Sequence, residues 1–146
     1  MSSVATALTI GALAEAAGCN VPTVRYYEEI GLMPKAARRS SGHRAYSAND
    51  LKRLIFVRRC RDLDFPIDKV RELVALMDDP NSDCARVRDL TEAQLSVVRK
   101  KLAELREFEH SLQRLSADCA DQCAGGQSRD CVILQDFRET PTCCGS

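Results

Sequence analysis

The chain has 146 residues, of which 45% are hydrophobic and 29% charged, as in one globular domain or a small domain with an extension. These values exclude collagen-like and low-complexity proteins, and every apolar run is far shorter than a bilayer span. We find no secretory signal pattern, so we expect a cytoplasmic protein that associates with no membrane. The 21 basic and 21 acidic side chains cancel overall, but residues 25–61 carry ten basic and three acidic groups. We therefore expect a polyanion as the partner of this segment.

The first expected elements are two short helices joined by a turn. Thr9 can cap a helix that runs to Ala17, where Gly18 ends it. A second helix is expected to begin near Val21 and to end at Gly31. Two short helices with a glycine in the turn between them are typical of a helix-turn-helix.

A small wing and two more helices are expected to complete the first domain. Proline, serine and glycine in residues 32–46 forbid a long helix, and Ser41-Gly42 predicts the turn between two short strands. Ser47 begins a capping box and a helix to about residue 61, and a further helix covers about 65–77. The sequence thus predicts a winged helix-turn-helix DNA-binding domain over residues 8–77.

Residues 84–115 contain neither glycine nor proline and are expected to form one long helix of about 48 Å. Its apolar residues follow the a and d positions of a heptad repeat. Such a stripe is longer than a small domain can cover, so we expect a homodimer joined by a two-stranded coiled coil; the alternative is a helix that folds back on its own domain. The a and d residues are Leu95, Val98, Leu102, Leu105 and Leu112.

The last 31 residues are expected to have little regular structure. Residues 116–137 are interpreted as a metal-binding loop in which a short helix begins near Cys131. Residues 138–146 are interpreted as a flexible tail. The fold class expected for the chain is therefore mainly α.

Basic and aromatic side chains gather where a helix-turn-helix meets DNA. The second helix of such a motif enters the major groove, where an arginine can reach a guanine edge or a phosphate. Basic side chains of the wing would contact backbone phosphates. The expected DNA contacts are Thr23, Arg25 and Tyr26 on the helix, with Arg38, Arg39, His43 and Arg44 in the wing.

Eight cysteines, five of them in the last 28 residues, require a separate explanation. In a cytoplasmic chain they are expected to be reduced and to serve metal or redox chemistry. Cys19 and Cys60 stand alone and are interpreted as packed thiols. The pair Cys143-Cys144 either assists metal capture or has no role.

The remaining thiols occupy opposite ends of the long helix. Cys84 lies at its start and Cys119 beyond its end, about 50 Å away within one chain. In an antiparallel pair of helices, the start of one helix meets the end of the other. We therefore expect a site built from Cys84 of one protomer with Cys119 and Cys131 of its partner, with Cys123 as an alternative ligand.

The donor set points to a soft divalent ion. Three thiolates without a histidine in the loop favour Cd²⁺, Pb²⁺, Zn²⁺ or Hg²⁺ over hard cations. Clustered thiols also oxidise, so a thiol-oxidation or electrophile sensor on the same fold is the alternative. No arrangement of nucleophile, base and orienting group indicates an enzyme.

From Leu8 to about Phe137 the chain resembles the MerR family of transcription regulators. The resemblance rests on residues 9–14 (TIGALA), residues 23–32 (TVRYYEEIGL), Arg38 and residues 42–46 (GHRAY). Cys84 is similar to the cysteine that divalent-metal sensors place at the start of the dimerisation helix, and the residues from Cys131 are similar to the end of the loop in cadmium, lead and zinc sensors. The spacing between Cys84 and Cys119 matches the family, so the resemblance favours Cys119 over Cys123 as the ligand.

The resemblance also implies a partner and a mechanism. It implies a homodimer with an antiparallel coiled coil that binds an operator within an overlong promoter spacer. Metal binding then changes the shape of the dimer, and the distorted DNA realigns the promoter for RNA polymerase. The missing loop histidine of the zinc sensor favours cadmium or lead.

Overall fold

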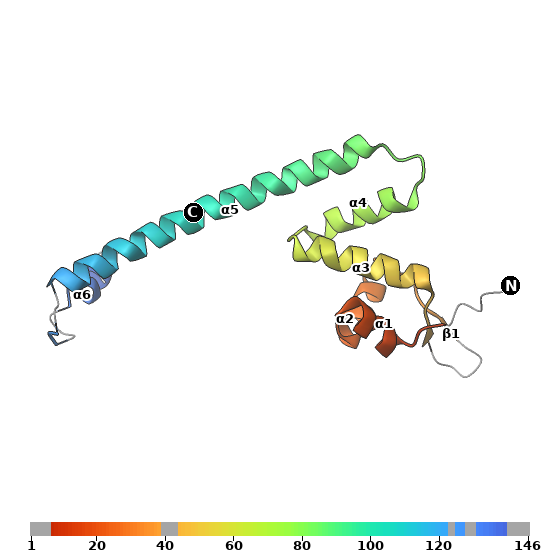
Figure 1. Cartoon of the computed structure of the whole chain (residues 1–146), viewed down its shortest axis with the longest axis horizontal. Coiled ribbons are helices and arrows are strands. Elements are labelled where there is room, and N and C mark those ends of the chain that lie inside the picture. The colour runs from red at the N-terminus through yellow and green to blue at the C-terminus, as the bar shows by residue number, and fades with distance from the viewer. Residues whose placement is uncertain (1–6, 39–43, 123–124, 128–130, 140–146) are drawn as a thin grey trace. The chain divides into compact units, whose positions relative to one another are not determined.

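The structure, a computed structural model, describes residues 7–38, 44–122, 125–127 and 131–139 (Figure 1). It divides into two compact units, Met1–Gln94 and Leu95–Ser146. The mainly helical fold with a winged helix-turn-helix is confirmed. The helices are α1 (Ile10–Ala17), α2 (Val21–Glu29), α3 (Ala48–Asp62), α4 (Ile67–Asp78), α5 (Cys84–Gln122) and α6 (Val132–Glu139), and the strands are β1 (Ala37–Arg38) and β2 (Arg44–Ala45).

Side-chain caps define the two helices of the helix-turn-helix. The Thr9 side chain accepts a hydrogen bond from the backbone N–H of Ala12, as the sequence predicts. Gly18 ends α1 with a φ of 68°, a left-handed conformation that glycine adopts without strain. Asn20 caps α2 by accepting from the N–H of Thr23, a role that the sequence analysis does not assign.

The wing and the two following helices begin and end close to the predicted residues. β1 and β2 pair antiparallel, and an isolated bridge joins Leu8 to Tyr46 next to the pair. The expected wing turn at 41–42 lies outside the described residues. The predicted capping box of Ser47 and Asp50 is present at the start of α3, and Pro66 is the N-cap of α4.

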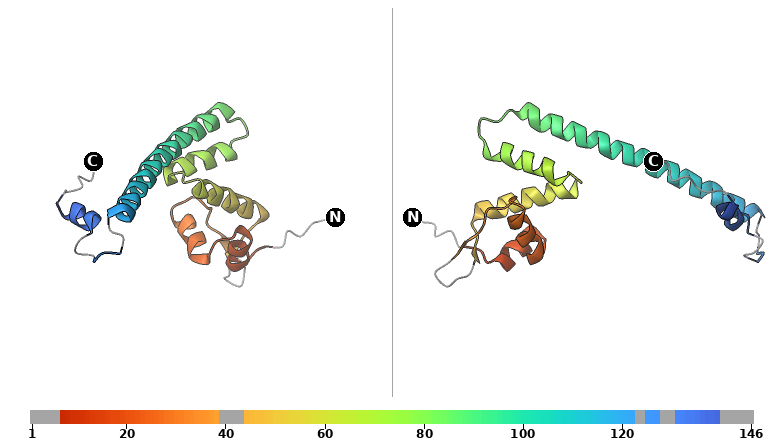
Figure 2. Two further views of the ribbon diagram at one scale, coloured as in Figure 1. Left: turned by 60° about the vertical axis from the view of Figure 1, so that its left-hand side comes forward. Right: turned by 180° about the vertical axis from the view of Figure 1, so that it is seen from behind.

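One hydrophobic core holds the first unit together. Figure 2 shows α1, α2, α3 and α4 from two further directions. α1 packs on α2 and α3, and α3 packs on α4. The early part of α5 adds Leu90 to the same core. The core side chains with no exposed surface at all are Leu13, Val24, Leu54, Val57 and Val70.

The long helix is longer than predicted. It starts at Cys84 as expected but ends at Gln122 instead of residue 115. Residues 116–122 contain no glycine or proline, so the helix continues after its apolar stripe ends, and the first glycine beyond it is Gly125. Within Leu95–Ser146 the helix keeps several large apolar side chains exposed: Leu95, Val97, Leu102, Leu105, Phe108 and Leu112.

The short helix α6 begins directly after Cys131, as the sequence predicts. A shallow cavity lies between it and the end of α5, lined by Ser111, Arg114, Leu115 and Asp118 of α5 and by Asp136 of α6. Leu134 and Phe137 of α6 are exposed. No helix in the described part of the chain has the length and apolarity needed to cross a membrane.

Candidate functional site

Helix α2 presents a polar face and buries an apolar one. Val24 and Tyr27 are buried in the core, whereas Arg25 and Tyr26 are exposed. The side chain of Tyr26 is 48% exposed, and its ring lies 5.6 Å from that of Tyr27. Tyr27 therefore belongs to the core, whereas Tyr26 lies at the surface of α2.

Thr23 takes part in the N-terminal cap of α2. Its hydroxyl donates to Oδ1 of Asn20 over 2.6 Å, and its backbone N–H donates to the same oxygen over 2.9 Å. The Thr23 side chain is half-buried. Its hydroxyl oxygen still has lone pairs that can accept a hydrogen bond.

The wing brings two of its expected contact residues into register. Arg38 of β1 pairs with Arg44 of β2 across the antiparallel ladder. The expected contacts Arg39 and His43 lie outside the described residues. The wing also contacts α2, because the hydroxyl of Tyr46 donates to the carboxylate of Glu28.

The thiols expected to bind metal lie at the two ends of α5 and just before α6. Cys84 is the first residue of α5 and is exposed, while Cys119 is half-buried. Because α5 ends at Gln122, Cys119 lies within the last turn of the helix. The prediction that Cys119 lies beyond the end of the helix is wrong. Cys131 directly precedes α6 and is half-buried. The other expected C-terminal thiols, Cys123, Cys143 and Cys144, lie outside the described residues.

A single chain does not assemble these thiols into one cluster. Cys84 and Cys119 are separated by 35 residues of helix, or about 50 Å at 1.5 Å per residue. Among the described residues, no three histidine, cysteine, aspartate or glutamate side chains form a group that could hold a metal ion. A site that contains both cysteines needs a second chain.

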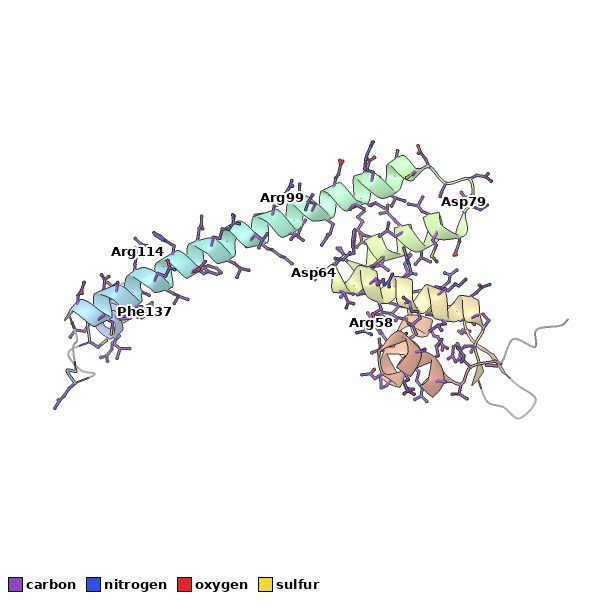
Figure 3. All side chains as sticks on the ribbon, viewed as in Figure 1. Arg58, Asp64, Asp79, Arg99, Arg114 and Phe137 are labelled. Atoms are coloured by element: carbon purple, nitrogen blue, oxygen red, sulfur yellow. The ribbon has the colours of Figure 1, made fainter. Side chains whose placement is uncertain are left out.

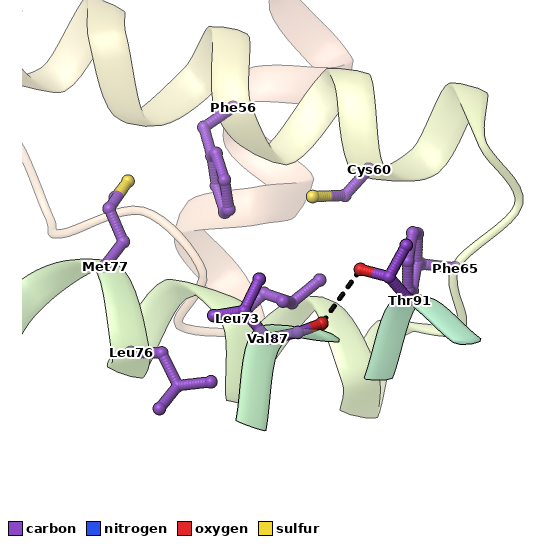
Figure 4. A pocket seen from close by; sticks show the side chains of 8 residues that line it. All are labelled: Phe56, Cys60, Phe65, Leu73, Leu76, Met77, Val87 and Thr91. Carbon is purple, nitrogen blue, oxygen red and sulfur yellow. Dashed lines mark hydrogen bonds between the residues drawn. The ribbon is translucent and has the colours of Figure 1, made fainter. Parts of the chain in front are cut away.

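Cys19 and Cys60 behave as the packed thiols that the sequence predicts. Cys60 belongs to the core, and Cys19 packs against it. Burial raises the pKa of both thiols, and the nearby Arg58 guanidinium partly opposes the rise at Cys19. Cys60 also lines an apolar cavity of about 350 Å³ between α3, α4 and the start of α5 (Figure 4).

Polar contacts between distant segments have no signal in the sequence. Tyr46 and Glu28 are 1% and 8% exposed, and Gln94 of α5 is 8% exposed. Residues that are 18 or 30 positions apart give no local signal that they meet. A tyrosine beside two strands and a glutamate on a short helix are ordinary surface residues by pattern alone.

Family models match most of the first unit and part of the second. The MerR HTH family regulatory protein model matches residues 8–76, and the MerR DNA-binding model matches residues 51–115. The regulator HmrR of Rhizobium leguminosarum bv. viciae is 35% identical over 132 residues, which cover 90% of this chain and 98% of HmrR. ZntR of Escherichia coli K12 is 37% identical and covers 89% of this chain and 92% of its own length.

Solved structures share the fold of this chain. The transcription regulator PbrR691 from Ralstonia metallidurans CH34, solved in complex with lead(II), is 40% identical with a TM-score of 0.75 and covers 89% of this chain and 98% of its own. HiNmlR, a MerR-family regulator solved on promoter DNA, shares the fold at 22% identity and a TM-score of 0.60, over 86% of this chain and 96% of its own. The chain therefore belongs to the MerR family of DNA-binding transcription regulators.

Proposed function

We propose that the chain forms a homodimer that regulates transcription in response to a soft divalent metal ion, with Cd²⁺, Pb²⁺ and Zn²⁺ as the candidates and Hg²⁺ as a further one. The carrying observation is that Cys84 begins α5 while Cys119 lies in its last turn, with Cys131 at the start of α6. Similar proteins support a metal response, because PbrR691 was solved in complex with lead(II) and another relative is the heavy metal-dependent transcription regulator 2 of Rhizobium meliloti.

The proposed site joins two protomers. In an antiparallel pair of α5 helices, Cys84 of one protomer would lie beside Cys119 and Cys131 of its partner. Three thiolates suit a soft ion, which would hold the two chains together at that point when bound. Two such sites per dimer would result.

The proposed DNA surface combines α2 with the wing. Arg25 and Tyr26 are exposed on α2, and Thr23 retains an acceptor at the start of that helix. The wing residues Arg38, Arg39, His43 and Arg44 would contact phosphates, which position a protein without reading the sequence. We propose that the dimer binds operator DNA at a promoter and changes its shape for RNA polymerase.

Metal can change transcription only by binding one conformation of the dimer better than the other. We therefore expect the metal-bound dimer to favour the conformation that distorts the operator. Cys84 and Cys119 belong to different ends of α5, so a shared site would bias how two helices pair.

The first experiment measures metal uptake by the reduced protein. We expect one Cd²⁺ or Pb²⁺ per chain, with a thiolate-to-metal charge-transfer band in the ultraviolet. Substitution of Cys84, Cys119 or Cys131 by Ser should remove uptake and induction while operator binding in a gel shift is kept. Absence of uptake by the parent protein, with a transcriptional response to peroxide or an electrophile, would assign the thiols to redox sensing instead.

A heterodimer tests whether the site is shared. A Cys84→Ser chain paired with a Cys119→Ser chain keeps one complete set, because one protomer still supplies Cys84 and the other Cys119 and Cys131. We expect about one metal ion per such heterodimer. Zero ions would contradict the shared site. Induction lost in Cys123→Ser and kept in Cys119→Ser would instead identify Cys123 as the ligand.

A further inference from the structure

Three long side chains of α3, α4 and the early part of α5 donate four hydrogen bonds to the ends of other helices. Each bond reaches a backbone carbonyl far away in the sequence. Gln94 donates from α5 to the turn after α3, Arg58 donates from α3 to the end of α1, and Arg71 donates from α4 to the end of α2. Figure 3 labels Arg58 and the turn residue Asp64.

Gln94 is the last residue of the first compact unit and is 8% exposed. Its Nε2 donates over 3.2 Å to the carbonyl of Leu63 and over 2.9 Å to that of Asp64. A side-chain amide has two N–H donors, so each one serves one carbonyl. The backbone of Asp64 has a φ of 64°, a left-handed conformation that residues other than glycine rarely adopt. The surrounding contacts must therefore stabilise this turn.

Two arginines hold the ends of the helix-turn-helix in matching ways. Arg58 Nη1 donates over 2.6 Å to the carbonyl of Ala17, the last residue of α1. Arg71 Nη2 donates over 2.7 Å to the carbonyl of Ile30, the C-cap of α2. A cation at a helix C-terminus interacts favourably with the exposed carbonyls and the helix dipole. The α3–α4 pair therefore donates a hydrogen bond to the C-terminal end of each helix of the helix-turn-helix.

These contacts are arranged in series. Gln94 fixes α5 to the turn from which α4 starts, and Arg71 of α4 fixes the end of α2. We propose that Gln94 and Arg71 are positioning residues for DNA recognition and act as successive links, so that the orientation of α2 follows α5 through α4. The proposal concerns specific DNA binding by the family fold, so it stands apart from the identity of any metal.

The test uses full-length protein without metal and two duplexes. One duplex is selected by the parent protein from a random-sequence pool, and the other is its shuffled counterpart. The ratio of the two dissociation constants measures discrimination. A lost charge that only attracts phosphates weakens binding to both duplexes alike and leaves this ratio unchanged.

We expect Arg71→Gln to lower the ratio about fivefold, the effect of one net hydrogen bond on an equilibrium, and Gln94→Met, which removes two bonds, to lower it by at least that factor. The ratio of the double variant should be no lower than that of the more affected single variant. If Gln94 acts through Arg71, loss of either contact already interrupts the coupling, and loss of the second has no further effect. Multiplied effects would overturn the proposal, since independent distant sites add in free energy. An unchanged ratio in either single variant would also overturn it.

Matched controls exclude simpler causes. Arg88→Gln removes the same charge from a residue whose ion pairs stay within α5. Thr91→Val removes a hydroxyl that donates to the Val87 carbonyl of its own helix (Figure 4). Both should keep the parent ratio, and Arg71→Lys, which retains the charge and a donor on a long side chain, should largely restore it. If Gln94→Met shows no cooperative urea transition, Gln94→Asn supplies the same comparison with a shorter amide.

Discussion

The hydroxyl of Tyr46 donates a hydrogen bond to the carboxylate of Glu28, and both side chains are buried. Tyr46 directly follows β2, and Glu28 lies in the last turn of α2. The bond therefore joins the wing to the helix that is proposed to enter the major groove. A contact in this position links the two elements that we propose as the DNA-binding surface.

Tyr46→Phe should destabilise the protein although the aromatic ring that packs in the core is kept. The substitution removes the hydroxyl donor from a buried carboxylate, which costs about 1–3 kcal/mol. Urea unfolding of the full-length protein measures the change. The double variant with Glu28→Gln completes a double-mutant cycle. If its change in unfolding free energy equals the sum of the changes in the two single variants, the pair does not interact.

Gly18→Ala should destabilise the turn between α1 and α2. A Cβ at this position would lie 2.2 Å from Nη1 of Arg58, and the φ of 68° is unfavourable for alanine. The left-handed conformation alone costs about 1–2 kcal/mol. Gly11→Ala is the matched control, because a Cβ there has no neighbour within 4 Å and Ala favours a helix by about 1 kcal/mol. Thermal melts should move in opposite directions for the two variants.

Arg25→Ala should weaken operator binding strongly and leave the fold and the oligomeric state unchanged. Arg25 is exposed on α2 and does not belong to the core, so its removal does not disturb the packing. Loss of one base or phosphate contact costs about 1–3 kcal/mol in each DNA-binding domain. A gel-shift titration measures the loss, and equal affinity of parent and variant would remove Arg25 from the interface. Glu29→Ala on the same helix tests for general effects of truncation.

Leu102→Asp should prevent dimer formation. Leu102 is 47% exposed in the single chain and occupies a central a position of the stripe on α5. Burying an unpaired carboxylate in the seam costs roughly several kcal/mol. Light scattering should report a monomer or an aggregate. Ala103→Asp adds the same charge one position away from the stripe and should leave the dimer intact; a stable Leu102→Asp dimer would place the seam elsewhere.

The ion pair of Glu72 should make stability depend on pH in the acid range. Glu72 accepts from Lys69 over 2.6 Å and from Arg86 of α5 over 2.6 Å, and these hydrogen bonds lower its pKa from 4.5. A lowered carboxyl pKa stabilises the folded chain above the ordinary glutamate value, and this contribution is lost as the pH falls through the lowered pKa. Urea midpoints measured from pH 6 downward should fall more steeply for the parent than for Glu72→Gln. The control Glu92→Gln, whose pair with Arg88 spans 4.0 Å within one helix, should keep the parent slope.

Local signals in the sequence predict most of the helical elements. Thr9 and Ser47 mark helix starts because their side chains accept hydrogen bonds from free backbone N–H groups. Gly18 marks a helix end because glycine adopts the left-handed backbone conformation without strain. The a and d stripe likewise predicts a long amphipathic helix that starts at Cys84. The same reasoning ends that helix too early, because the end of an apolar stripe is not a helix stop, whereas a glycine is.

Tertiary structure alone decides which side chains join these elements. The pairs Tyr46–Glu28, Arg71–Ile30 and Gln94–Asp64 span 18, 41 and 30 positions along the chain. A side chain that donates to a distant carbonyl has the same type and surroundings in the sequence as one directed to solvent. Caps, breaks and periodicity depend on near neighbours and so can be predicted from the sequence. The hydrogen bonds at the ends of α2 and α3 depend on how α3, α4 and the first turns of α5 pack, and only the folded chain brings their partners within hydrogen-bonding distance.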